Sequence, residues 1–384
     1  MNMSVELKSK KFIIFFLILV VILSSLGFLI PPLIETKWRF FPESKSLEVV
    51  GFLPYWNLNE ETKVDFAVVD TLIYFGLQVD ENGEIMKVQD GGTEPGLAKL
   101  NSEALTQLMT KARQHGKKVV ICFASFDASV MKQISQDKEK QATLIGEIIN
   151  TIAEKKFDGV DIDFEYFPDG DDPDFGKDFN SFLINLKNKL GNLALSVDIY
   201  PKAVIEDKPY NLKLMDGIVD RIILMAYDFT QSISDTTGPV APLKAEGEGE
   251  KGYSVTKALQ ASFGKISGSK LVLGIPLYGY EWETVDHQPR TSAYSRTGIV
   301  ASFTRVKELI EKQNLKPQWD ATASSPWLSY EDEGVKKQIY YEDMKSISLK
   351  VELAKQLKLA GIAFWALGYE GEYQDIWQYL KKTL

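Results

Sequence analysis

The stretch FDGVDIDFEY, residues 157–166, alternates apolar and acidic side chains from Val160 onward. Alternation with period two is typical of a β-strand, whose successive side chains point to opposite faces. One face of this strand is apolar and carries Val160, Ile162 and Phe164. The other face carries three carboxylates, those of Asp161, Asp163 and Glu165. Because an apolar face packs against covering helices, the carboxylates are predicted to face the interior of a closed sheet.

Three carboxylates on one inward stripe are costly to bury unless they share protons or take part in chemistry. Their crowding disfavours full ionisation, so we expect one or two of the pKa values to be raised, as a general acid requires near neutral pH. The alternative is an acidic strand end that binds a cation or forms salt bridges, although no basic residue is interleaved. Asp158 is out of phase with this stripe, and we expect a structural role for it.

Seven further segments have the composition of buried strands: Leu47–Tyr55, Asp70–Val79, Lys118–Ser125, Leu193–Tyr200, Val219–Phe229, Lys270–Tyr280 and Ala360–Leu367. Amphipathic helical patterns lie between several of them, at 105–112, 144–152 and 175–186. Strands that alternate with helices predict parallel βαβ units, and eight of them predict an α/β fold, the (β/α)8 TIM barrel. Glu165 lies nearest the C-terminal end of its strand, where the active sites of such barrels are found. The alternative, a doubly wound open sheet, is disfavoured because no G-x-G-x-x-G turn follows the first strand.

A long interval separates the seventh and eighth predicted strands. Residues 281–343 combine a helical pattern at 302–313 with strand-like pieces at 327–330 and 337–341, which predicts a small α+β insertion between these two strands. Its tryptophans form either a groove wall or a small hydrophobic core; they are Trp282, Trp319 and Trp327. The stretch KAEGEGEKG at 244–252 is predicted to be a flexible loop.

The N-terminal segment 12–30 is apolar and uncharged, long enough to cross a bilayer as a helix. Lysines precede it at 8, 10 and 11, which favours a cytoplasmic N-terminus and an exported body. We therefore predict a cytoplasmic tip and a transmembrane signal-anchor in 1–30, a linker in 31–45 and a catalytic barrel in 46–384 on the outer side of the cell membrane. The alternative is a cleaved signal peptide, with a poor cleavage site at 25–27, which would leave a secreted protein.

Charge and composition exclude several function classes. A net charge of -9 and an isoelectric point near 5.1 argue against a nucleic-acid partner, which requires a basic face. One cysteine and two histidines disfavour a catalytic zinc site, and a single cysteine cannot form an intramolecular disulfide. We expect no metal, no cofactor and a monomeric chain.

Several motifs resemble one known family. The spacing Asp158-x-x-Asp161-x-Asp163-x-Glu165 resembles the D-x-x-D-x-D-x-E signature of glycoside hydrolase family 18, the chitinase family. The sequences MAYD at 225–228 and GIAFW at 361–365 resemble the ends of its sixth and eighth strands. The segments GFLPYW at 51–56 and IYF at 73–75 are similar to its first two strands. The resemblance extends from about residue 49 to the C-terminus, and the motifs together are more specific than any one of them.

The resemblance implies substrate-assisted retaining hydrolysis of polysaccharides that contain β-linked N-acetylglucosamine, without an enzyme nucleophile. Glu165 would protonate the leaving oxygen and later deprotonate water. Asp163 would accept a hydrogen bond from the acetamido N–H and would share a proton with Asp161. Tyr227 would donate its hydroxyl to the acetamido oxygen, which attacks the anomeric carbon.

The same resemblance implies a set of substrate-binding residues. Asp228 would contact sugar hydroxyls, and Trp365 would form an apolar floor beneath the sugar. The remaining members of this set are Met225, Tyr55 and Phe75. A catalytically weak carbohydrate-binding protein and an unrelated barrel enzyme are the alternatives, and the polymer stays open between chitin, peptidoglycan and N-glycan cores.

The third strand departs from the family pattern. The family carries S-x-G-G where this chain has CFAS at 122–125. The serine of that motif supports the inner aspartate, and a thiol is a weaker hydrogen-bond donor. Cys122 is therefore predicted to support Asp161 less firmly, which affects rate more than mechanism.

Overall fold

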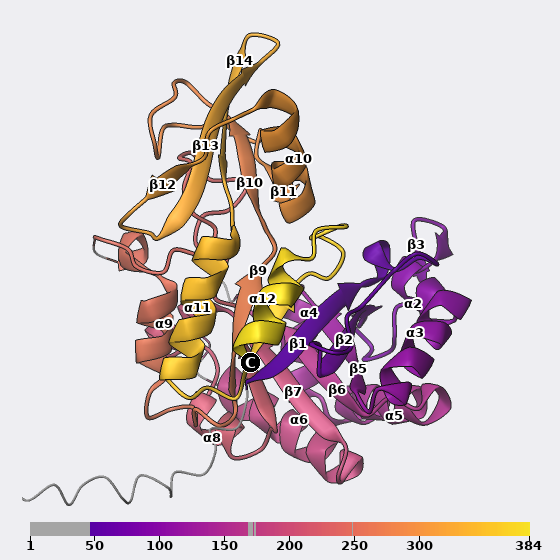
Figure 1. The fold of residues 1–384 in the computed structure, drawn as a ribbon. Coiled ribbons are helices and arrows are strands. Elements are labelled where there is room, and N and C mark those ends of the chain that lie inside the picture. The colour runs from indigo at the N-terminus through magenta and orange to yellow at the C-terminus, as the bar shows by residue number, and fades with distance from the viewer. Residues whose placement is uncertain (1–46, 168–171, 173, 248) are drawn as a thin grey trace, which may run out of the picture. The chain divides into compact units, whose positions relative to one another are not determined.

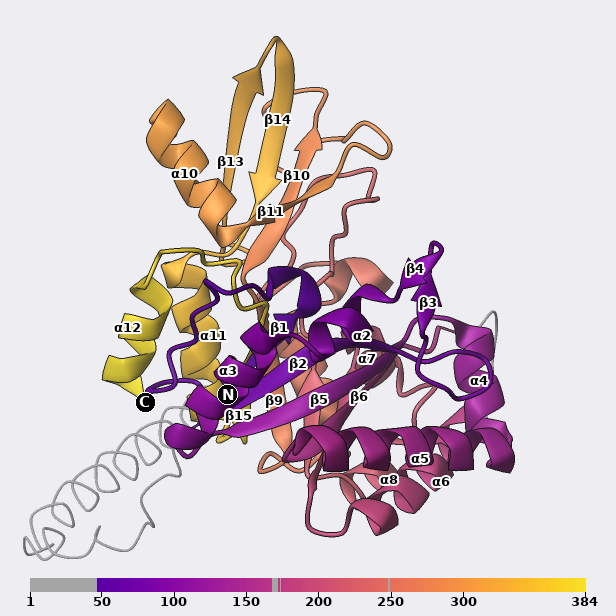
Figure 2. The same cartoon turned by 90° about the vertical axis from the view of Figure 1, so that its right-hand side faces the viewer.

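The chain folds around a closed barrel of parallel strands (Figures 1 and 2), in a computed structural model that describes residues 47–384 except 168–171, 173 and 248. The barrel order is β1-β15-β9-β8-β7-β6-β5-β2. Its strands are β1 (Glu48–Pro54), β2 (Thr71–Gln78), β5 (Lys118–Ser125), β6 (Gly159–Phe164), β7 (Ala194–Ile199), β8 (Arg221–Leu224), β9 (Leu271–Pro276) and β15 (Gly361–Trp365). All eight predicted segments supply a barrel strand, and the predicted (β/α)8 barrel is confirmed.

Helices cover the outside of the barrel because each carries one apolar stripe. They are α2 (Pro95–Leu100), α3 (Glu103–Gln114), α4 (Ala128–Gln136), α5 (Lys138–Lys155), α6 (Phe175–Leu190), α7 (Pro201–Glu206), α8 (Leu212–Asp216), α9 (Val255–Ser262), α11 (Met344–Gln356) and α12 (Asp375–Thr383). The apolar face of β6 meets α6, where the ring of Phe164 lies 6.0 Å from that of Phe179 and 6.2 Å from that of Phe182. Short elements complete the connections: the 3-10 helices Tyr55–Asn57 and Gly249–Gly252, and the hairpin β3 (Val88–Gln89) with β4 (Gly92–Thr93).

The interior of the barrel is divided by polarity. Most strands turn small or apolar side chains inward, and these form one buried cluster: Val50, Phe52, Ile73, Phe75, Val120, Cys122, Ala124, Ile223, Val272 and Ala363. The neighbouring strands β6 and β7 instead bury four polar side chains, those of Asp161, Asp163, Ser196 and Asp198. A polar stripe inside an otherwise apolar barrel marks the part of the fold that is not explained by packing.

Two predicted strands have different boundaries in the structure. The segment 270–280 is two strands, because the chain leaves the barrel at Leu277, whose N–H donates to the carbonyl of Trp365 at 2.6 Å. Its second part, β10 (Tyr278–Glu283), belongs to the insertion, which therefore begins three residues earlier than predicted. The segment 219–229 contains only the four residues of β8, since residues after Leu224 turn through local backbone hydrogen bonds such as Tyr227 N–H to Met225 O at 2.7 Å.

The insertion is a five-stranded antiparallel sheet in the order β11-β10-β14-β13-β12. Besides β10 it contains β11 (Ile299–Ser302), α10 (Phe303–Gln313), β12 (Gln318–Asp320), β13 (Ser325–Asp332) and β14 (Val335–Tyr340). Figure 2 shows α10 beside this sheet, and a small apolar core that includes Val306 and Leu328 joins the two. The side chains of Trp282 and Trp327 are buried in the main hydrophobic core, and Trp319 lies under the ammonium of Lys345. Trp282 and Trp327 therefore belong to a hydrophobic core, as one of the two alternatives predicted, but to the main core and not to the small core of the insertion.

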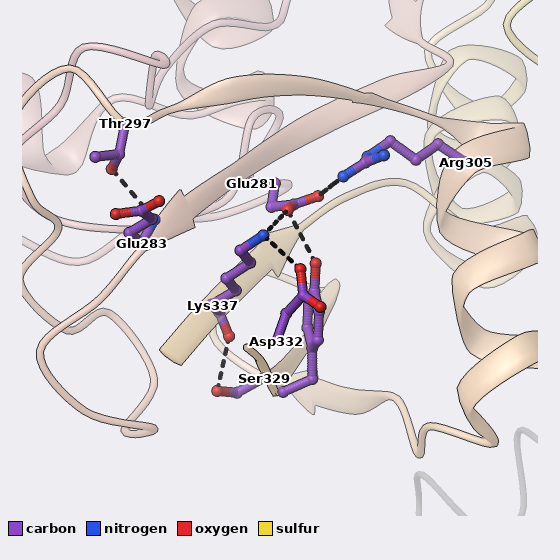
Figure 3. Close-up of polar contacts among 8 residues, drawn as sticks. Glu281, Glu283, Thr297, Arg305, Ser329, Asp332 and Lys337 are labelled. Carbon is purple, nitrogen blue, oxygen red and sulfur yellow. Dashed lines mark hydrogen bonds and ion pairs between the residues drawn. The ribbon is translucent and has the colours of Figure 1, made fainter. Parts of the chain in front are cut away.

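One buried carboxylate ties α10 to the insertion sheet (Figure 3). Glu281 on β10 accepts hydrogen bonds from Arg305 of α10, at 2.6 and 3.1 Å, and from the hydroxyl of Tyr330 at 2.9 Å. The ammonium of Lys337 lies 3.8 Å from the same carboxylate and 2.9 Å from Asp332. Each charge has an opposite partner, so this cluster has the character of a structural anchor.

The predicted membrane helix and linker, residues 1–45, lie outside the described residues. Within the described part of the chain, no helix combines the length and the apolar character needed to cross a membrane. The predicted loop at 244–252 is interrupted by the short 3-10 helix at its end.

Candidate active site

Strand β6 places its carboxylates at different depths along one line. Asp161 pairs with Cys122 and Asp163 with Ala124 in the register with β5, and both aspartates are buried. Glu165 follows the last residue of the strand and is half-buried, with its N–H donated to the carbonyl of Ser125 at 3.2 Å. The strand thus leads from the barrel interior to its C-terminal mouth, as the alternation predicted.

A cavity of about 260 Å³ opens at this mouth. Eight of the nine predicted site residues line it: Tyr55, Phe75, Asp163, Glu165, Met225, Tyr227, Asp228 and Trp365. The ninth, Asp161, is fully buried beneath them and does not line the cavity. These residues lie at or just beyond the C-terminal ends of β1, β2, β6, β8 and β15, and they converge on one space.

The carboxylates around the cavity are strongly perturbed. Burial and the nearby Asp228 carboxylate raise the pKa of Glu165 to about 7. Burial, together with Glu165 and Asp161, raises the pKa of Asp163 well above its usual range. Among the described residues, no ion pair reaches Asp161, Asp163 or Glu165. With a pKa of about 7, the Glu165 carboxyl is partly protonated at neutral pH and can therefore act as a general acid beside this acidic pair.

Asp228 is held by the insertion. The hydroxyls of Tyr278 and Tyr280, both on β10, donate to its Oδ1 atom, the second at 2.9 Å. Burial raises the pKa of Asp228, and these two donors oppose that rise. The tyrosines thus fix a cavity carboxylate from outside the barrel.

The indole of Trp365 forms one wall of the cavity. It meets the ring of Phe75 edge-on at 4.8 Å and those of Phe52 and Trp56 at 5.6 and 6.3 Å. Trp56 itself is 47% exposed. An aromatic wall of this kind suits the apolar face of a sugar ring.

A second buried glutamate near this wall has another role. Burial raises the pKa of Glu370 to about 7, yet its side chain does not line the cavity. It accepts the N–H of Gly368 at 2.7 Å and the indole N–H of Trp377 at 3.2 Å. Glu370 therefore fixes the loop that follows Trp365.

Comparison with known proteins places the chain in a family. Residues 48–370 match the family model described as glycosyl hydrolases family 18. The chain belongs to glycoside hydrolase family 18. The resemblance in the sequence motifs is thereby confirmed.

Curated relatives of this family 18 chain include bacterial glycosylases. The uncharacterized glycosylase YvbX of Bacillus subtilis is 26% identical, over 67% of this chain and 70% of its own length. The cortical fragment-lytic enzyme of Bacillus anthracis is 27% identical over 64% of this chain, which spans about half, 54%, of that relative.

Solved structures of a chitinase and of a spore cortex-lytic enzyme share the fold. The Group IV chitinase of Ostrinia furnacalis is similar over 88% of this chain and 99% of the chitinase chain, at 20% identity and a TM-score of 0.75. The spore cortex-lytic enzyme SleL of Bacillus cereus covers 88% of this chain with 74% of its own, at 21% identity and a TM-score of 0.68.

Sequence reasoning missed several residues of this family 18 site. The cavity is also lined by Trp56, Gly76, Gln78, Ala124, Phe126 and Tyr278. Two further polar residues, Ser196 and Asp198, lie below it on β7. Their signal was present, because they alternate with the apolar Leu195, Val197 and Ile199 as the acidic residues of β6 do.

In the described chain, no group of three or more His, Cys, Asp or Glu side chains has a geometry that would hold a metal ion.

Cys122 lies beneath this family 18 site. Its thiol is fully buried, and the register of β5 with β6 pairs Cys122 with Asp161. Burial and the nearby aspartates raise the pKa of the thiol well above its usual range, so it stays neutral. The structure thus places Cys122 where the sequence comparison expected a donor to the inner aspartate.

We expect Cys122→Ser to keep the fold and leave activity equal or higher. A hydroxyl donates a stronger hydrogen bond than a thiol, so the ionised form of Asp161 is favoured and its pKa falls. The acidic limb of the pH–rate profile should then move to lower pH. The free energy of unfolding should change by less than about 1.5 kcal/mol, because the side chains of cysteine and serine have similar volumes. A large loss of activity in a folded variant would contradict this role and give the thiol a function of its own.

Proposed function

We propose that this chain hydrolyses polysaccharides containing β-linked N-acetylglucosamine by a substrate-assisted, retaining mechanism. The observation that carries the proposal is the convergence of Glu165, Asp163 and Tyr227 on one cavity, with Glu165 protonated up to about pH 7. These are the groups that such a reaction needs: a proton donor, a partner for the acetamido N–H and a donor to the acetamido oxygen.

In the first step the Glu165 carboxyl gives its proton to the glycosidic oxygen as the bond from that oxygen to the anomeric carbon breaks. The acetamido oxygen of the same sugar forms the new bond to that carbon, giving an oxazolinium ion. Burial and nearby carboxylates raise the pKa of Tyr227 far above neutrality, so its hydroxyl remains a donor that orients the acetamido oxygen. The buried Asp163 accepts the acetamido N–H, and negative charge in the Asp161–Asp163 pair stabilises the cation.

In the second step the Glu165 carboxylate accepts a proton from water. The water oxygen then bonds to the anomeric carbon, the acetamido oxygen leaves, and Glu165 is protonated again. The hydrolysed sugar keeps the configuration of the original bond, since the carbon is attacked twice from opposite sides. Trp365, Tyr55 and Phe75 contribute apolar surface for the sugar, while Asp228 and Met225 border the same cavity.

Peptidoglycan is the natural polymer that we propose. The support is twofold: relatives named cortical fragment-lytic enzymes, and a predicted N-terminal segment that exports the barrel. Chitin oligomers share the 2-acetamido sugar and form the second candidate, supported by relatives named as chitinases. The chain is proposed to act as a monomer.

Product profiling tests this function. The purified barrel is incubated with chitin pentasaccharide and with purified peptidoglycan, and products are separated by mass. We expect cleavage at N-acetylglucosamine, with peptidoglycan the faster substrate. Binding of both polymers without any cleavage would contradict the proposal and favour the catalytically weak, carbohydrate-binding alternative.

The proposed location is the outer face of the cell membrane, with residues 12–30 as the anchor. The full chain should then remain with membranes after a high-salt wash and be released by detergent. A chain recovered from the medium with a new N-terminus after residue 27 would instead support the cleaved, secreted form.

A further inference from the structure

Asp198 is a buried carboxylic acid for which neither the family motifs nor the proposed reaction has a use. It lies on β7 next to the end of the strand, 3% exposed, and pairs with Ile223 of β8. It does not line the cavity, so it has no direct access to a substrate. Any influence on the reaction must pass through its neighbours.

The neighbour that matters is Asp161. The hydroxyl of Ser196 donates to Asp161 Oδ1 at 2.5 Å, and Cys122 is the residue paired with Asp161 in the register of β5 with β6. Asp198 is buried on the neighbouring strand β7, and its carboxyl comes within hydrogen-bonding reach of Asp161. Two carboxyl groups can share a hydrogen bond only when one of them carries the proton.

The surroundings decide which of the two carries it. Asp161 receives the hydroxyl of Ser196, and a donor favours the ionised form of a carboxylate. Oδ2 of Asp161 and Oδ1 of Asp198 are both buried without a hydrogen-bond partner, but no hydroxyl donates to Asp198 among the described residues as Ser196 does to Asp161. The proton therefore belongs on Asp198, and Asp161 is the anion.

The groups that face Asp198 agree with this assignment. From β6 these are Asp161 and Asp163, with Glu165 beyond them, and from the chain after β8 the neutral hydroxyl of Tyr227. The remaining neighbours, Ser196, Ile223 and Cys122, are uncharged. No cation among the described residues is paired with Asp198, so its ionisation would add one more negative charge to a buried acidic cluster.

We propose that Asp198 is a positioning residue that stays protonated and donates a hydrogen bond to Asp161, which keeps Asp161 ionised beneath the cavity. The inference rests on the proposed function, because the charge on Asp161 serves to stabilise the positive charge of the oxazolinium ion. A lost donor makes Asp161 easier to protonate, so the pair loses its negative charge at a higher pH.

Two variants separate the hydrogen bond from the charge. Asp198→Asn keeps a donor toward Asp161, and Asp198→Ala removes it. On p-nitrophenyl chitobioside we expect Asp198→Asn to retain kcat within about threefold and an unchanged pH profile. Asp198→Ala should lower kcat about tenfold or more with little change in KM and move the acidic limb upward by about half a pH unit or more. Val197→Ala, on the outer face of the same strand, is the packing control and should not move the limb.

A stability measurement gives a second readout that needs no substrate. An aspartate that binds its proton more tightly when folded makes the native state less stable as pH rises above the unfolded pKa, about 4. Asparagine has no proton to lose. The melting temperature of Asp198→Asn minus that of the wild type should therefore increase by a few °C between pH 4 and pH 8.

Each outcome judges the assignment. An Asp198→Ala variant with wild-type rates and pH profile would show that Asp198 only fills space and would overturn the proposal. If the basic limb of the pH–rate profile moves to lower pH in Asp198→Asn, Asp198 is ionised in the wild type and the proposal is overturned. The same conclusion follows if the difference in melting temperature does not increase with pH. If the wild type cleaves no polymer, the proposed function fails, and the melting difference still decides whether Asp198 holds the proton.

Discussion

Glu165→Gln is expected to lower kcat on N-acetylglucosamine oligomers by a factor of about 10²–10⁴ while KM and the fold remain close to those of the wild type. The amide has nearly the shape of the carboxyl group but has no proton to give to the leaving oxygen and cannot take one from water. Stopped product assays over chitin pentasaccharide concentrations, with circular dichroism for the fold, measure this. Glu283→Gln, a half-buried glutamate of β10 outside the cavity, is the matched control.

The pH profile provides a further check on this residue. The pKa of Glu165 is raised to about 7, and the acid form is the active one in the first step. Wild-type activity should therefore fall as pH rises through about 7, and this basic limb should be missing from the residual activity of the variant. A variant that keeps more than about a tenth of wild-type turnover would show that the proton donor is another group.

Substrates that lack the acetamido group should be inert. Cellulose oligomers carry a hydroxyl at the same carbon and fully deacetylated chitin carries an amine, so neither provides an internal oxygen nucleophile. The structure offers no obvious replacement, because Asp163 is buried at the base of the cavity and carries a strongly raised pKa. We expect cleavage of chitin pentasaccharide to exceed that of cellopentaose by at least the hundredfold associated with losing a well-placed reacting group.

A thiazoline analogue of the oxazolinium ion provides the inhibition arm of this experiment. It should compete with chitin oligomers, since it resembles the intermediate more closely than the substrate does. Comparable cleavage of cellulose and chitin oligomers would contradict substrate assistance. Such a result would point to an ordinary reaction with two protein carboxylates.

The barrel was predictable because its signal is local. Each strand needs only its own apolar pattern to be recognised, and β5 has the predicted boundaries, 118–125. One boundary error lies after Leu224, where local turns end the strand, and the other lies where a distant contact ends it. The apolar pattern continues through Leu277, yet the backbone there is bound to Trp365, which lies far along the sequence. Periodicity carries no information about such a contact.

For the site, the sequence by itself determined the carboxylate stripe of β6, because a strand's pleat puts every second residue on one face. It also located the motif residues at the ends of their strands. Only the tertiary structure decided what surrounds them. The register between β6 and β7 sets Ser196 beside Asp161, and the insertion brings the hydroxyls of Tyr278 and Tyr280 to Asp228. Burial inside this enclosure, which no single strand has, is what raises the pKa of Glu165 to about 7.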